Sequence, residues 1–239
     1  LGGSYNTAIG KFALKANTSA DANTALGYNA LFANTTGSSN TALGVNCMDA
    51  NTTGASNTAV GVDTLNQNTT GIQNVSVGES SLSTNTTGSY NTALGRTSLL
   101  SNTTGTHLSA VGRSALQNNT TGSNNTGIGF DAGYTTTTGN YNVSIGFNSK
   151  ATSATASGQF TLGDSNISNL RCNDTSISSL SDSRDKTDVI DSPYGLDFIN
   201  TVRPVQFLWD TRDGNAKDGT TRIGFLAQEL LAATNGNNA

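Results

Sequence analysis

Hydrophobic and polar positions recur with a fixed period along most of the chain. Glycine returns every 17 residues from Gly10 to Gly163, and each of these ten glycines follows an aliphatic residue. A second apolar column lies four residues after the glycine, at Leu14, Leu31, Met48, Leu65, Leu82, Leu99 and Leu116, and it fails at Gly133 and Lys150. Helical-hairpin repeats need about 33 residues or more. The period therefore predicts one short β-structured coil per unit.

The consensus N-T-A-L-G-x-x-A-L-x-x-N-T-T-G-x-x predicts the shape of each coil. Both glycine columns suit corners with positive φ, and the Asn-Thr-Thr-Gly segments have turn chemistry. The Thr/Ala/Leu/Val stretches between corners suit short strands. About four residues per coil are expected to point inward, such as Ala42, Leu43, Cys47 and Met48. The fold class is mainly β: a parallel β-solenoid (β-roll) of about ten 17-residue coils over residues 1–163, with Asn, Thr and Leu ladders at about 4.8 Å spacing.

Composition narrows the function classes. Only 34% of the residues are hydrophobic and 12% are charged, with a net charge of −4. No basic stripe is available to neutralise phosphates, which excludes nucleic acid as a partner. No apolar run of about 18 residues is present, which excludes membrane insertion by a helix. Only about four inward residues per coil make a thin core, and a thin core favours packing of several chains side by side.

The units N-T-A-L-G and N-V-S-I-G (Asn142 to Gly146) resemble the S-x-A-I-G repeats in the heads of YadA-type trimeric autotransporter adhesins. The resemblance covers residues 1 to about 163. It implies a left-handed parallel β-roll in which three chains pack about one axis.

The composition changes after the repeats. Residues 164–180 are rich in Ser and Asn and are interpreted as a linker, and residues 181–239 hold the only Trp and both Pro of the chain. Periodicity in this last segment predicts a helix over 195–202, strands over 205–209 and 221–225, and a helix from 227 to 233. A small α+β C-terminal domain is therefore expected over 181–239.

Three landmarks in the last segment, taken together, resemble the peptidase S74 domain, the intramolecular chaperone of endosialidase. They are S-D-S-R-D-K (Ser181 to Lys186), V-R-P-V-Q-F-L-W (Val202 to Trp209) and I-G-F-L-A-Q-E-L (Ile223 to Leu230). The resemblance implies a domain that trimerises, guides folding of the upstream fibre and cuts the Leu180–Ser181 bond. That domain usually continues into a long C-terminal helix, so the one here is expected to be incomplete.

The resemblance assigns catalysis to Ser181 and Lys186. A serine hydroxyl becomes a good nucleophile when a base takes its proton, and a lysine with a lowered pKa can be that base. Such a pair would make the chain at most a single-turnover, self-cleaving peptidase, with non-enzymatic repeats. The alternative is that the charged residues from Asp182 to Lys186 form a solvated turn.

Other candidate residues carry less chemistry. Cys47 and Cys172 lack the spacing of a metal site, and both are expected to be unpaired. The alternative is a disulfide bond between the Cys172 residues of neighbouring subunits. His107 is the only histidine, so a surface or structural role is expected. The aspartates Asp49, Asp63 and Asp131 form no calcium pattern. No metal and no cofactor are predicted, and the Asn-Thr-Thr units are expected to be ladder residues although they match glycosylation sequons.

The combined interpretation is a structural, homotrimeric fibre or appendage of a virus or phage, located on the virion surface. Its expected partners are two further copies of itself, other virion tail proteins, and a host surface glycan or protein receptor. A bacterial trimeric adhesin on the cell surface and an ice-binding solenoid are the alternatives. An enzyme acting on host polysaccharide is disfavoured because the repeats show no paired inward carboxylates.

Overall fold

The computed structural model describes residues 3–169, 204–208 and 221–224. The chain divides into two compact units, Leu1–Arg171 and Cys172–Ala239. No helix occurs in the described residues.

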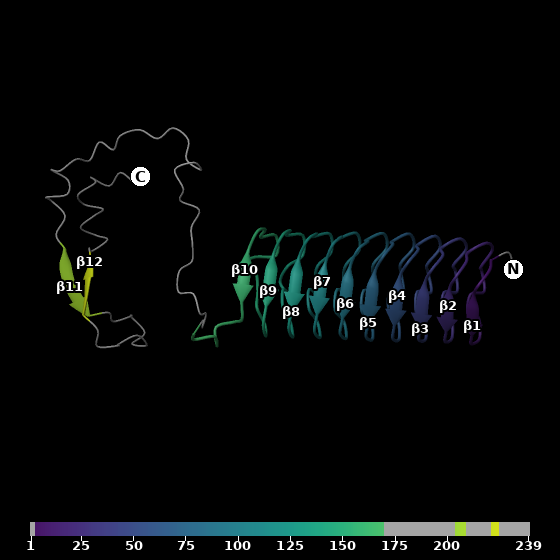
Figure 1. Cartoon of the computed structure of the whole chain (residues 1–239), viewed down its shortest axis with the longest axis horizontal. Helices are drawn as coiled ribbons and strands as arrows, with labels where there is room; N and C mark the ends of the chain where they lie inside the picture. The colour runs from purple at the N-terminus through teal and green to yellow at the C-terminus, as the bar shows by residue number, and fades with distance from the viewer. Residues whose placement is uncertain (1–2, 170–203, 209–220, 225–239) are drawn as a thin grey trace, which may run out of the picture. The chain divides into compact units, whose positions relative to one another are not determined.

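The first unit is a stack of coils, each with one three-residue strand (Figure 1). The strands are β1 (Thr7–Ile9), β2 (Thr24–Leu26), β3 (Thr41–Leu43), β4 (Thr58–Val60), β5 (Val75–Val77), β6 (Thr92–Leu94), β7 (Ser109–Val111), β8 (Thr126–Ile128), β9 (Val143–Ile145) and β10 (Phe160–Leu162). They form one ten-stranded parallel sheet in sequence order. The predicted parallel β-solenoid of 17-residue coils is confirmed.

The register between coils equals the sequence period. Thr24 pairs with Thr41, Ala25 with Ala42 and Leu26 with Leu43. Backbone bonds continue around the coil, because Gly44 N–H donates to the carbonyl of Leu26 at 2.9 Å. Identical side chains consequently lie above one another in ladders, as the repeat predicted.

In each coil, two small side chains and one large side chain point into the core. Ala42, Cys47 and Met48 are fully buried, as predicted. The prediction for Leu43 is wrong: the strand alternates, so its central alanine points inward and Leu43 lies half-buried on the outer face. The aliphatic column before the corner glycine thus belongs to the surface.

Buried asparagines form two ladders that satisfy the backbone at the coil corners. In the first, the Nδ2 of Asn51 donates to the Oδ1 of Asn34 at 2.8 Å and to the carbonyl of Gly54 at 3.0 Å. In the second, the Oδ1 of Asn57 accepts from the backbone N–H of Asn74 at 2.9 Å. Buried polar groups need such partners, and each coil supplies them to its neighbour.

Glycine is needed in the two glycine columns for different reasons. Gly44 has φ of +145°, and its column keeps positive φ throughout, as predicted. The Thr-Thr-Gly column does not have positive φ, so the prediction of a second positive-φ corner is wrong. A Cβ on Gly37 would lie 2.2 Å from the carbonyl oxygen of Gly54 and 2.6 Å from the Oδ1 of Asn34, so the next coil and the asparagine ladder together exclude a side chain there.

In the second unit the structure describes one antiparallel strand pair, β11 (Val205–Leu208) and β12 (Thr221–Gly224), with Val205 opposite Gly224. Both strands were predicted. The predicted helices over 195–202 and 227–233 lie outside the described residues.

Candidate functional site

The predicted cleavage residues lie outside the described residues. This applies to Leu180, Ser181 and Lys186, and also to Cys172. The Ser–Lys pair and the intersubunit disulfide therefore stay predictions. The functional features that the structure does describe are surfaces of the solenoid.

An aliphatic stripe runs along the outer face of the ten-stranded sheet. It consists of the residue that ends each strand: Ile9, Leu26, Leu43, Val60, Val77, Leu94, Val111, Ile128, Ile145 and Leu162. Seven of these side chains are between 36% and 59% exposed, and the other three are half-buried. An uninterrupted row of exposed aliphatic side chains is characteristic of an interaction surface. The repeat pattern shows this column, but its apolar character predicts a place in the core and not on the surface.

A threonine column follows another edge of the coils. Thr36, Thr53, Thr70, Thr87, Thr104, Thr121 and Thr138 are all exposed. The threonines before them are less exposed, and their hydroxyls bond to the next coil, as when the Oγ1 of Thr52 donates to the carbonyl of Thr69 at 3.0 Å. The column is therefore a single row and not the two-row T-x-T array that ice binding would need.

Asp49 is the one carboxylate near the coil surface with a buried, unpartnered oxygen among the described residues. Burial of the carboxylate, and second the nearby charge of Asp63, raise the pKa of Asp49 above its ordinary value of 3.8. Asp63 itself accepts a hydrogen bond from the Nδ2 of Asn46 at 3.0 Å. An asparagine suits this environment better than an aspartate at neutral pH.

The Asp49→Asn variant is expected to be more stable than the parent protein at pH 7, by less than about 1 kcal/mol because solvent screens the site. A raised folded-state pKa means that the folded protein binds the proton more tightly than the unfolded chain. The parent protein therefore loses stability as pH rises from the ordinary aspartate range through the raised pKa, and the variant does not. Thermal unfolding of both proteins at pH 4 and pH 7 measures this difference, and equal pH profiles would contradict it.

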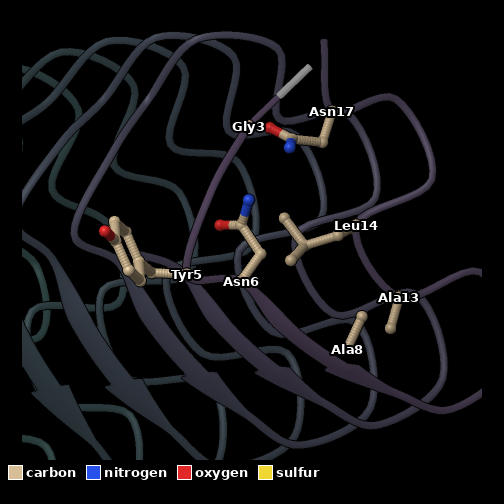
Figure 2. Close-up of a pocket in the computed structure, with 7 residues that line it drawn as sticks. All are labelled: Gly3, Tyr5, Asn6, Ala8, Ala13, Leu14 and Asn17. Atoms are coloured by element: carbon tan, nitrogen blue, oxygen red, sulfur yellow. The ribbon is translucent and has the colours of Figure 1, made fainter. Parts of the chain in front are cut away.

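A pocket of about 290 Å³ opens at the first coil (Figure 2). Its lining includes Ala8 and Leu14, which occupy columns that are buried in the following coils. Its polar residues are Tyr5, Asn6 and Asn17, and the Nδ2 groups of both asparagines donate to the carbonyl of Ala20. The pocket is the uncovered end of the core columns, and its polar groups serve the backbone.

Two further candidates have structural roles. His107 is exposed and stacks on Tyr90 with ring centroids 4.9 Å apart, in agreement with the expected surface role. Cys47 is buried, and burial raises the pKa of its thiol to about 12. A thiol with that pKa is not a nucleophile at neutral pH.

The described residues contain no group of three or more His, Cys, Asp or Glu side chains that could hold a metal ion. Within the same residues, no helix is long and apolar enough to cross a membrane. The asparagines of the Asn-Thr-Thr units from Asn34 to Asn119 are fully buried in the first ladder. They are ladder residues, as predicted.

Comparison with known proteins supports the second resemblance. Residues 181–236 match the family Peptidase_S74, described as the chaperone of endosialidase. No curated protein and no solved structure matches the chain significantly. A segment of the endosialidase-chaperone type that follows a β-solenoid fits a tail-fibre-like protein.

Proposed function

We propose that the chain is part of a homotrimeric, host-contacting fibre of a virus or phage. In this proposal the solenoid is the shaft and residues 181–239 are the trimerisation chaperone. The observation that carries the proposal is the match to the endosialidase chaperone on the C-terminal side of a repetitive β-structured segment. A bacterial adhesin would share the solenoid, but the match of residues 181–236 to the endosialidase chaperone favours the fibre.

The aliphatic stripe supports a homo-oligomer with its axis parallel to the solenoid. Ten strands at about 4.8 Å spacing give a stripe roughly 45 Å long. Because each copy carries one such stripe, three copies around a common axis would bury all three stripes and leave none in water. The 17-residue repeat would then align each coil with the corresponding coils of the other two copies.

The double variant Val77→Glu/Leu94→Glu is expected to convert the trimer to monomers. It would place a carboxylate in the stripe on two neighbouring strands, and three copies would bring six uncompensated charges to one axis. Native mass spectrometry measures the change. The matched control Thr70→Glu/Thr87→Glu adds the same charges to the threonine column and is expected to remain trimeric.

A monomeric parent protein would contradict the proposal of a homotrimer. A trimer that survives both double variants would keep the homotrimer and show that another face joins the copies.

Self-cleavage is the second part of the proposal. The family match begins at Ser181, the residue after the proposed cut, which supports this position. Denaturing mass spectrometry of the purified parent protein is expected to show a break at the Leu180–Ser181 bond. Ser181→Ala and Lys186→Ala are each expected to leave the chain intact, whereas Arg184→Ala, a change in the same charged segment, is expected to be cut. An intact parent chain would contradict the assignment of Ser181 and Lys186.

A further inference from the structure

The first two coils carry a patch of aromatic and cationic side chains that the repeat does not require. It consists of Lys11, Phe12, Lys15, Tyr28 and Phe32, and is called the Lys/Phe patch below. Lys11 and Lys15 are exposed, Phe12 is 38% exposed and Tyr28 is 45% exposed. The corner glycines Gly10 and Gly27 separate this patch along the chain from the aliphatic stripe.

The geometry of the patch centres on the ring of Phe12. The ammonium groups of Lys11 and Lys15 lie 4.9 and 4.8 Å from its centroid. Lys15 also lies 5.2 Å from the ring centroid of Phe32. The rings of Tyr28 and Phe32 meet Phe12 edge-on, with centroid distances of 6.0 and 6.2 Å.

Phe12 departs from its column at a conformational cost. Its φ is +68°, and the same position in later coils holds small residues suited to the left-handed region, such as Asn29, Asn46 and Asp63. The coil imposes this conformation on the whole column, whose φ lies between +51° and +68°, and an aromatic residue bears more of its cost than an asparagine does. The repeat therefore does not account for a phenylalanine at this position.

Among the described residues, neither ammonium group has a carboxylate within ion-pair distance. The only ion pair among the described residues joins Arg96 to Glu79, far along the coil stack. Two like charges held over one ring repel each other, and an anion placed between them would relieve that repulsion. The exposed rings beside them offer flat apolar surfaces.

We infer that the Lys/Phe patch binds acidic polysaccharide through sugar rings that carry carboxylates. The exposed ring of Tyr28 would pack against the C–H face of the pyranose, and Lys11 and Lys15, held over Phe12, would each bind a carboxylate. This inference rests on the proposed role as a host-contacting appendage and names the chemistry of the contact. Single-stranded nucleic acid also stacks on aromatic rings, but it is held in a positively charged groove that follows several successive phosphates, whereas the patch offers two ammonium groups beside one ring.

Saturation-transfer NMR with the full chain tests the inference, using oligogalacturonate and oligomannuronate as probes and neutral cello-oligosaccharide as the reference. Both acidic probes are expected to bind saturably, more weakly at high salt, and the neutral reference is not. Lys11→Gln/Lys15→Gln and Phe12→Asn are each expected to weaken binding about tenfold. Lys150→Gln, which removes a lysine at the other end of the coil stack, is expected to leave binding unchanged.

Three outcomes would overturn the inference: no binding of either acidic probe, equal binding by the patch variants and the parent, or preferential binding of oligothymidylate. Circular dichroism of each variant checks that the coils remain folded, and Phe12→Asn restores a residue that later coils already use. Native mass spectrometry of the same samples separates the two proposals. A trimer that does not bind the acidic probes would contradict the inference about the Lys/Phe patch but not the proposed fibre. A monomer that binds them would support the inference about the patch and contradict the proposed fibre.

Discussion

Replacing Gly44 with alanine is expected to destabilise the solenoid by about 3–5 kcal/mol. Two costs combine at this position. Gly44 has φ of +145°, a conformation that L-residues rarely adopt, and the new Cβ would lie 2.6 Å from the carbonyl carbon of Gly61 and closer still to its oxygen. Both obstacles are backbone, so no side chain can rotate away to make room.

Gly158→Ala is the control for an alanine at a positive φ that meets no neighbouring atom. Gly158 has φ of +69°, but a Cβ there would meet nothing within 4 Å. Only the conformational cost applies, about 1–2 kcal/mol. Denaturant midpoints at equal protein concentration measure both variants against the parent. If the two alanines cost the same, contact between coils does not select glycine in this column.

Replacing Asn57 with leucine is expected to cost about 2–4 kcal/mol, although the two side chains have similar size. The Oδ1 of Asn57 accepts from the N–H of Asn74 at 2.9 Å, and its Nδ2 donates to the carbonyl of Gly71 at 2.9 Å. Leucine removes these two bonds and those that join Asn57 to the side chains of Asn40 and Asn74, and it leaves the buried N–H of Asn74 without this acceptor. The burial of two more methyl groups offsets only part of this loss.

The chain contains one natural interruption of the same ladder, at Leu108. The N–H of Leu108 still donates to the Oδ1 of Asn91 at 3.0 Å, but the next coil receives no acceptor from it. There the Nδ2 of Asn125 turns to the Oδ1 of Asn119 at 3.2 Å, the end of the other ladder. At Asn57 that ladder continues on both sides, so the same adjustment is not available.

Gln67→Leu is the control for this second substitution, because Gln67 is exposed and lies in the same 17-residue unit as Asn57. It is expected to change stability by less than about 0.5 kcal/mol. Hydrogen exchange at the amide of Asn74 gives an independent measure, with lower protection expected in Asn57→Leu alone. Equal stability of the two variants would mean that the ladder contributes little.

The sequence by itself determined the coil and its register. A period of 17 residues, an aliphatic residue before each glycine from Gly10 to Gly163, and turn residues between short strands admit few structures other than a parallel stack. The strands at 205–208 and 221–224 followed from alternation, and the match at 181–236 followed from three short motifs. These features depend on short segments or on a regular repeat, so they can be predicted without knowing which residues distant in the sequence are in contact.

The tertiary structure decided which side of the coil each residue faces. In a strand of three residues only the central one points inward, so Ala42 is buried and Leu43 is not, although leucine is the more apolar. Met48 and its equivalents adopt left-handed φ near +50°, which their residue types disfavour.

That conformation persists because it turns the chain while placing each large apolar side chain in the core between two equivalent neighbours. Its cost is repaid only in the stack. Pattern alone could not assign the outer face, the aliphatic stripe or the Lys/Phe patch, because these depend on where the backbone turns between columns.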